Sequence, residues 1–142
     1  MNTTAVKIVL DTNVFISCIG KSSPFRRIFE GILEGRFLLC LSHEILLEYQ
    51  EVLGRKTTAE ITENITQFLH IYPHVLKTEI FYNWQLIALD QDDNKFVDCS
   101  VAANAFCIIS NDKHFKPFRN HDFPPLRVMT TSEFEAEYKL SR

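Results

Sequence analysis

The stretch KIVLDTNVF at residues 7–15 combines a buried strand with a polar end. Ile8, Val9 and Leu10 form a continuous apolar run, and a carboxylate, a hydroxyl and a carboxamide follow directly at 11–13. A strand that is apolar on both faces is typical of a parallel sheet covered by helices on each side. Because polar side chains are costly to bury, their presence at the end of such a strand suggests that a ligand replaces the lost water there.

Two other segments have the same character as this strand. Residues 37–41 (FLLCL) and 106–109 (FCII) are short and apolar, and the second also ends in polar residues, SND at 110–112. Residues 126–129 (LRVM) are predicted to form the last strand. Strands of this kind that alternate with helices indicate an α/β fold with a parallel sheet covered on both faces.

Apolar residues at helical spacing and capping residues predict helices between the strands. The interval 75–89 is ambiguous, with a short helix around 81–87 as its best interpretation, and the polar run DQDDN at 90–94 marks a break. The predicted helices run from Ser23 and Pro24 to Gly35, from Ser42 through Leu53, from the capping box at 57–60 to the residue before Pro73, from Asn94 to about Ala105, and onward from Thr130, which forms a second capping box with Glu133.

Composition limits the class of protein. A chain of 142 residues that is 46% hydrophobic is long enough for its own core, and we expect a single domain over residues 1–142. A net charge of -3 argues against a protein that coats nucleic acid by bulk charge, yet it permits a nucleic-acid enzyme whose acids gather in one cleft. No apolar run reaches the ~18 residues that a membrane span needs, and no CxxC pair occurs, so we expect a cytoplasmic protein with reduced cysteines and no membrane partner.

Acidic side chains stand at positions that this fold should bring together. In parallel sheets functional residues gather beyond the carboxyl ends of the strands, where both Asp11 and Asp112 are predicted to lie. Glu48 falls about 40° beyond the apolar stripe of its helix, which makes it the acid of that helix best placed to face the sheet. Asp93 lies at a helix start, from which its carboxylate can reach the same edge.

Each acid also has a simple structural explanation. Asp11 and Asp112 suit turns, and Asp93 suits helix capping. Glu48 suits a wet boundary position, while Asp98 is either an outer ligand or a solvated residue. Taken together, however, carboxylates held within a few ångströms either share protons or hold a cation. An all-oxygen set favours Mg²⁺ or Mn²⁺ over zinc.

A family resemblance rests on these same residues. DTNV at 11–14, Glu48, DDNKF at 92–96 and SND at 110–112 resemble the PIN domain, and in particular its VapC-like branch, the toxin components of toxin-antitoxin systems. The resemblance extends over nearly the whole chain. It includes LRVMTTSEF at 126–134, which is similar to the last strand and helix of that branch.

The resemblance implies a three-layer α/β/α sandwich with a central parallel sheet and a metal-dependent ribonuclease site made of four acids. An alignment can choose either Asp93 or Asp98 as the third acid, and we prefer Asp93 by its position. Carried over by motif, the catalytic and metal-binding residues are Asp11, Glu48, Asp93 and Asp112, with Asn13 and Ser110 as polar support.

These features predict an endoribonuclease that hydrolyses the phosphodiester bonds of RNA with Mg²⁺ or Mn²⁺. The resemblance further implies a toxin with a cognate antitoxin, and commonly a homodimer. Lys113, Lys116 and Arg119 follow the last strand-end acid and suit contact with RNA phosphates. Phe115 and Phe118 between them suit base stacking, and the alternative is a surface loop whose rings pack inward.

Two other functions stay open from the sequence. One is a catalytically inactive PIN-like module that binds RNA or a protein partner. The other is an aspartate-based phosphatase or phosphotransfer domain, which needs a second acid or a threonine near the strand-end aspartate and a lysine near the closing strand. Asn13, two positions after Asp11, disfavours this last function, whereas Lys113 keeps it open.

Overall fold

The strands form one sheet that is parallel except at one edge. The computed structural model describes residues 4–87 and 91–140, and within them six strands lie in the order β3-β2-β1-β4-β6-β5. Neighbouring strands are parallel, apart from the short β5, which runs antiparallel to β6. The strands are β1 (Val6–Leu10), β2 (Phe37–Leu41), β3 (Val75–Lys77), β4 (Cys107–Ile109), β5 (Asn120–His121) and β6 (Leu126–Met129).

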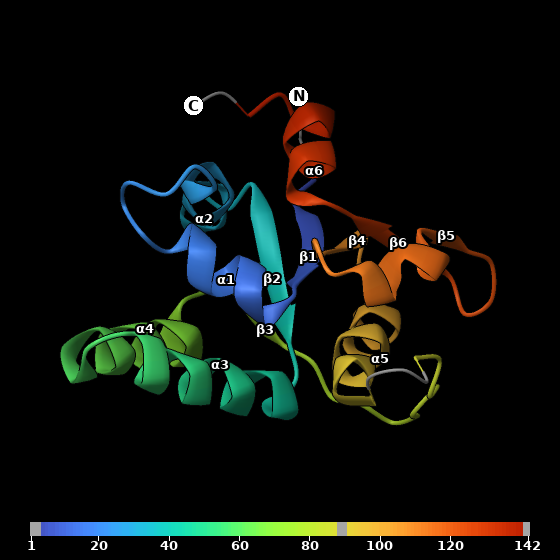
Figure 1. The fold of residues 1–142 in the computed structure, drawn as a ribbon, viewed down its shortest axis with the longest axis horizontal. Helices are drawn as coiled ribbons and strands as arrows, with labels where there is room; N and C mark the ends of the chain where they lie inside the picture. The colour runs from blue at the N-terminus through green and yellow to red at the C-terminus, as the bar shows by residue number, and fades with distance from the viewer. Residues whose placement is uncertain (1–3, 88–90, 141–142) are drawn as a thin grey trace.

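Helices flank this sheet. In Figure 1, α1 to α4 gather to one side of β1 and β2, and α5 lies to the other. The predicted three-layer α/β/α fold is therefore confirmed. The helices are α1 (Thr12–Cys18), α2 (Arg26–Leu33), α3 (His43–Lys56), α4 (Ala59–Ile71), α5 (Asn94–Ala103) and α6 (Thr131–Glu137), together with the 3-10 helices η1 (Gln91–Asp93) and η2 (Lys113–Phe118).

The central strands carry the apolar core that the sequence predicts. Ile8, Val9 and Leu10 of β1 are fully buried, and β1 is hydrogen-bonded to β2 on one edge and to β4 on the other. With both edges paired and both faces covered, these side chains lose contact with water, which explains the continuous apolar run. Burial of each such aliphatic side chain stabilises the fold by about 1.5–3 kcal/mol.

Two aromatic residues fix the carboxyl end of β1 against the helices. The ring of Phe15 in α1 stacks on the ring of Tyr49 in α3, with centroids 4.2 Å apart and planes 5° from parallel. The Tyr49 hydroxyl donates a hydrogen bond of 2.5 Å to the carbonyl of Leu10. Both rings are fully buried. The end of β1 and the first turns of α1 and α3 are thus held in one packed unit.

Two helices begin later than the sequence predicts. α2 begins at Arg26 because Ser23 forms a turn, in which its carbonyl accepts a hydrogen bond from Arg26 N at 3.1 Å. α4 is capped by Thr58, whose hydroxyl accepts a hydrogen bond from Ile61 N at 3.2 Å. The predicted cap, Thr57, instead ends α3. In both places the polar residues signal a helix start correctly, but the neighbouring element decides which of them caps the helix.

The predicted helix around 81–87 is wrong, because these residues contain no helix. Side chains of α5 bond the backbone groups of Trp84 and Ile87 instead. Asp98 accepts a hydrogen bond of 2.9 Å from Trp84 N, and the Asn94 amide bonds both the N–H and the carbonyl of Ile87, at 2.8 and 3.0 Å. Such side-chain partners replace the bonds that a helix would form within itself.

The sequence does not predict α1, a helix of only seven residues. Its N-cap residue, Asp11, makes no side-chain capping bond. α5 ends slightly earlier than predicted, at Ala103, because Asn104 adopts a left-handed conformation with φ of 53°. Residues 88–90, which include the start of the predicted polar break, lie outside the described part of the chain.

Candidate metal centre

Asp11 and Asp112 leave neighbouring strands at the same edge of the sheet. Leu10 and Ile109 are paired across β1 and β4, so the residues that follow them emerge side by side. Asp11 directly precedes α1, and Asp112 directly precedes η2. Both line a pocket of about 220 Å³, together with the exposed Asn13. The structure thus brings together the two strand-end aspartates that the topology predicts to be neighbours.

Ser110 connects these two aspartates. Its Oγ donates a hydrogen bond of 2.7 Å to Oδ2 of Asp11 and accepts one of 3.0 Å from the backbone N of Asp112. Ser110 is buried, so its hydroxyl is held between them without competition from bulk water. This arrangement gives the Asp11 carboxylate a fixed direction.

The Asp11 carboxyl lies in an environment that disfavours its charge. It is only 7% exposed, and this burial raises its pKa above the usual value. The hydrogen bond from Ser110 lowers the pKa, whereas the negative charges of Asp112 and Glu48 raise it. A cation placed among these carboxylates would reverse the unfavourable contributions, because an opposite charge stabilises the ionised form.

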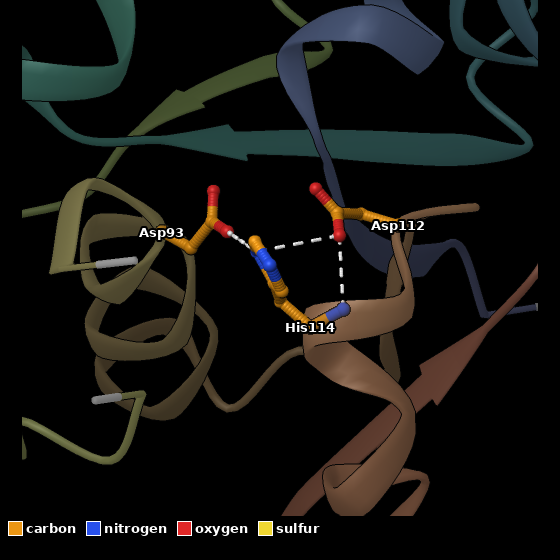
Figure 2. A group of neighbouring side chains, drawn as sticks. All are labelled: Asp93, Asp112 and His114. Atoms are coloured by element: carbon orange, nitrogen blue, oxygen red, sulfur yellow. Dashed lines mark hydrogen bonds and ion pairs between the residues drawn. The ribbon is translucent and has the colours of Figure 1, made fainter. Parts of the chain in front are cut away.

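A third acid and a histidine complete one side of this edge. Asp93, Asp112 and His114 each offer a ligand atom, and these atoms lie within 4.8 Å of one another. Nδ1 of His114 is 3.4 Å from Oδ2 of Asp93 and 3.5 Å from Oδ1 of Asp112. Figure 2 shows the imidazole between the two carboxylates, with Asp93 coming from the start of the α5 segment and the other two from the chain around η2.

Sequence reasoning missed His114. Its place follows from the turn that begins η2, where Oδ1 of Asp112 accepts a hydrogen bond of 2.9 Å from the backbone N of His114. An aspartate that bonds the backbone two residues further on is a common turn. The sequence signal that points to His114 is therefore a histidine two positions after a strand-end aspartate.

Glu48 has partners within the protein on both of its oxygens. Oε1 accepts a hydrogen bond of 2.6 Å from Nζ of Lys95, and Oε2 accepts one from the hydroxyl of Thr12. Thr12 follows Asp11 in the chain, so Glu48 lies beside the strand-end acids, and its charge contributes to the raised pKa of Asp11. From the sequence, Lys95 is a candidate to face the cleft, but the helix pattern does not decide the direction of its side chain.

Asp98 lies apart from this group of ligand atoms. Its carboxylate accepts the hydrogen bond from Trp84 N, and its side chain is buried with 6% exposure. Burial raises the pKa of the Asp98 carboxyl, and the nearby charge of Glu44 raises it as well. The expectation that Asp98 is solvated is wrong. Among the described residues, the group of neighbouring ligand atoms contains Asp93 and not Asp98.

The basic residues after Asp112 lie on the surface, but the aromatic rings between them do not. Lys113 and Lys116 are exposed, and Arg119 forms an ion pair with Glu133 of α6. Phe115 is fully buried, with its ring centroid 6.4 Å from that of Phe96, and the partly buried Phe118 packs against the core. Base stacking on Phe115 is therefore excluded, and the alternative of rings that pack inward is correct.

The four cysteines are free, buried thiols. Burial raises the pKa of Cys18, Cys99 and Cys107 to about 12 and that of Cys40 to about 11, so they stay protonated at neutral pH and are poor nucleophiles. In the part of the chain that the structure describes, no helix has the length and hydropathy that a membrane crossing requires.

The donor atoms at this edge fit a divalent ion. Asp11, Asp93 and Asp112 offer the carboxylate oxygens that Mg²⁺ and Mn²⁺ prefer. The imidazole of His114 adds a nitrogen, a ligand that suits transition-metal ions. Among the two predicted ions, Mn²⁺ accepts this mixed set more readily. Zinc sites are usually richer in nitrogen and sulfur than this one.

The fold and the acidic edge define the class of protein to which the chain belongs. It is an α/β/α protein with carboxylates at the carboxyl ends of its parallel strands. The PIN domain family model matches residues 7–114, which is more than half of the chain. The chain therefore belongs to the PIN domain family. No curated protein sequence matches it significantly.

Two solved structures have the same fold at low sequence identity. One is the crystal structure of VapBC2 from Rickettsia felis bound to a DNA fragment from their promoter: the matched chain is 16% identical, with a TM-score of 0.61, and the match covers 88% of this chain and 98% of that one. The other is the PIN domain endonuclease Utp24, with 15% identity, a TM-score of 0.54, and coverage of 87% of this chain and 84% of that one.

Proposed function

We propose that the protein is an endoribonuclease that hydrolyses RNA phosphodiester bonds with Mg²⁺ or Mn²⁺ as its cofactor. One observation carries the proposal: ligand atoms of Asp93, Asp112 and His114 lie within 4.8 Å of one another, and Asp11 lies beside Asp112 at the strand ends. Membership of the PIN domain family and the fold shared with the endonuclease Utp24 add support.

The side chains divide the work of such a site. Asp11, held by Ser110, is the principal ligand, and Asp93 and Asp112 complete the carboxylate set. Glu48 is held by Thr12 and Lys95 and orients the attacking water. A bound divalent ion lowers the pKa of water and offsets negative charge on the phosphate. No protein nucleophile is needed.

The exposed cations beside Asp112 suit a polyanionic substrate. Lys113 and Lys116 line a pocket of about 210 Å³ that adjoins the acidic edge through Asp112 and Ser110. We assign phosphate contacts to these two lysines. Arg119 lines the same pocket but is paired with Glu133, so it contacts RNA only if that ion pair opens.

The sequence resemblance to toxins supports a wider proposal about partners. A cognate antitoxin that covers the acidic edge would keep the nuclease silent until it is released, and the solved VapBC2 complex has the same fold in one of its chains. A homodimer, a cytoplasmic location and a single domain over residues 1–142 stay predictions from the sequence.

Cleavage of defined RNAs by the purified chain tests the activity. We expect cutting with Mn²⁺ or Mg²⁺, none with EDTA, and none by Asp11→Asn or Asp93→Asn. Asp122→Asn serves as a matched control, because Asp122 is an exposed acid in the loop between β5 and β6. Equal cleavage by the wild type and both site variants would contradict the proposal. Metal-independent RNA binding without turnover would favour the inactive-module alternative.

A further inference from the structure

We propose that each chain binds one divalent ion, and that the ammonium of Lys95 occupies the place of a second. The inference rests on the proposed function and adds the ion stoichiometry and a role for Lys95. Two-metal nucleases hold their ions about 3.5–4 Å apart between shared carboxylates, so that both the attacking and the leaving oxygen are stabilised. Here the carboxylate of Glu48 already holds a cation that belongs to the protein, the ammonium of Lys95.

The contact between Lys95 and Glu48 is short and largely enclosed. Nζ of Lys95 lies 2.6 Å from Oε1 of Glu48, and their side chains are 12% and 27% exposed. The other oxygen of Glu48 accepts the hydroxyl hydrogen bond of Thr12. Each oxygen of this carboxylate therefore has a donor within the protein, and one of the two donors carries a full positive charge.

Asp11 is connected to both sides of the edge. Ser110 bonds its carboxylate and the backbone N of Asp112, and Thr12, the next residue in the chain, bonds Glu48. Asp11 is therefore the acid that two ions would have to share. An ion held by Asp11 and Asp112 would have the imidazole of His114 within reach as a further ligand. An ion held by Asp11 and Glu48 would meet the Lys95 ammonium, and two cations at such short range repel each other.

The sequence explains why Lys95 reaches this position. It lies in the first turn of α5, two residues after Asp93, so the start of one helix supplies an acid to one side of the edge and a cation to the other. Nζ of Lys95 also lies 5.7 Å from the centroid of the Phe96 ring. A lysine suits this role because its ammonium is a compact point charge on an apolar stem.

Titration of the purified full-length chain with Mn²⁺, followed by the EPR signal of the free ion, measures the stoichiometry directly. The wild type should bind one Mn²⁺. Lys95→Met should gain a second Mn²⁺ site, because a repelling unit charge is removed. This second site should bind Mn²⁺ on the order of tenfold or more tightly than any second site in the wild type. Lys95→Arg keeps the charge and should bind one ion. Lys113→Met removes an exposed lysine beside Asp112 and should also bind one.

Two ions in the wild type would overturn the assignment, and so would a Lys95→Met chain that binds Mn²⁺ as the wild type does. A second ion in Lys113→Met would show a general effect of net charge and would likewise overturn it. If Lys95→Met fails to fold by circular dichroism, Lys95→Gln and the wild-type stoichiometry decide the matter. A wild type that binds no Mn²⁺ at all would contradict the proposed function itself. A wild type that binds two would contradict only the assignment of Lys95.

Discussion

The acidic edge of this protein has two halves that are neutralised differently. We call Glu48, Thr12 and Lys95 the lysine half, and Asp93, Asp112 and His114 the histidine half. In the lysine half an ammonium lies 2.6 Å from a carboxylate oxygen. In the histidine half the imidazole lies 3.4 and 3.5 Å from its two carboxylates, which is beyond the usual length of a strong charge-assisted hydrogen bond.

This difference indicates which half offers the better ligands for a metal ion. A lysine is a permanent donor that cannot ligate a metal while it is charged, whereas a neutral imidazole has a nitrogen lone pair to offer. The lysine half thus combines a carboxylate with a cation of the protein, and the histidine half combines two carboxylates with a nitrogen that can serve as a ligand. Burial is the largest cause of the raised pKa of Asp11, and the charges of Asp112 and Glu48, one from each half, raise this pKa further.

The largest expected effect comes from removing an acid of the histidine half. Asp112→Asn should lower Mn²⁺-dependent cleavage by about 10²–10³-fold, the range for loss of one preorganised charge-stabilising group. It should also abolish the rise in melting temperature that Mn²⁺ produces, because the ion would bind the folded chain far more weakly. Single-turnover cleavage and thermal melts with and without Mn²⁺ check both effects. A fully active Asp112→Asn chain would remove the histidine half from the site.

The next effect concerns the lysine half and appears as stability. A double-mutant cycle with Glu48→Gln and Lys95→Met should give a coupling energy of about 1–2 kcal/mol in urea unfolding, between the values for exposed and buried ion pairs. Glu48→Gln alone should destabilise more than the double variant, since it leaves an enclosed ammonium without its carboxylate. A coupling energy near zero would mean that the pair is not formed in solution.

A double-mutant cycle in the histidine half should give a smaller coupling energy than the cycle in the lysine half. With Asp112→Asn and His114→Gln in metal-free buffer at pH 7, we expect a coupling energy below about 0.5 kcal/mol, in the range of weak ion pairs. The contact of 3.5 Å between imidazole and carboxylate supports this expectation. A value equal to that of the lysine half would erase the proposed distinction.

The smallest expected effect is the contribution of the Asp11 carboxyl to the pH dependence of the free energy of unfolding. Because burial raises the pKa of this carboxyl in the folded chain, its ionised form costs folding free energy at neutral pH. Asp11→Asn should therefore be more stable than the wild type without metal at pH 7. That gain should shrink as the pH falls through the raised pKa and vanish below the unfolded value, where the wild-type carboxyl is protonated in both states. Urea unfolding of both chains from pH 7 to 4 measures it.

Much of the fold was predictable because burial leaves a plain pattern in the sequence. β1 and β2 contain apolar runs, and β1, β2 and β6 have the predicted bounds to within a residue or two. Ser42 and Thr130 cap helices as expected. The interval 81–87 was not predictable from its own residues, since Asn94 and Asp98 on another element take up its backbone groups. Local sequence does not report such distant partners.

The candidate site was predictable only as far as topology determines it. Asp11 and Asp112 had to be neighbours, because they follow parallel strands that are paired in the sheet. Of the two groups that neutralise the edge, His114 was missed, and the direction of Lys95 was left open. His114 depends on the exact turn at the start of η2, and Lys95 depends on the direction of a long side chain in the first turn of α5. Neither is fixed by hydrophobic periodicity or strand order.

Anomalous scattering from a crystal of the chain grown with Mn²⁺ would locate each bound ion. We predict one anomalous peak per chain, among Asp11, Asp93, Asp112 and His114, and none beside the Glu48–Lys95 pair. A peak between Asp11 and Glu48 with Lys95 displaced, or no peak anywhere along this edge, would contradict it.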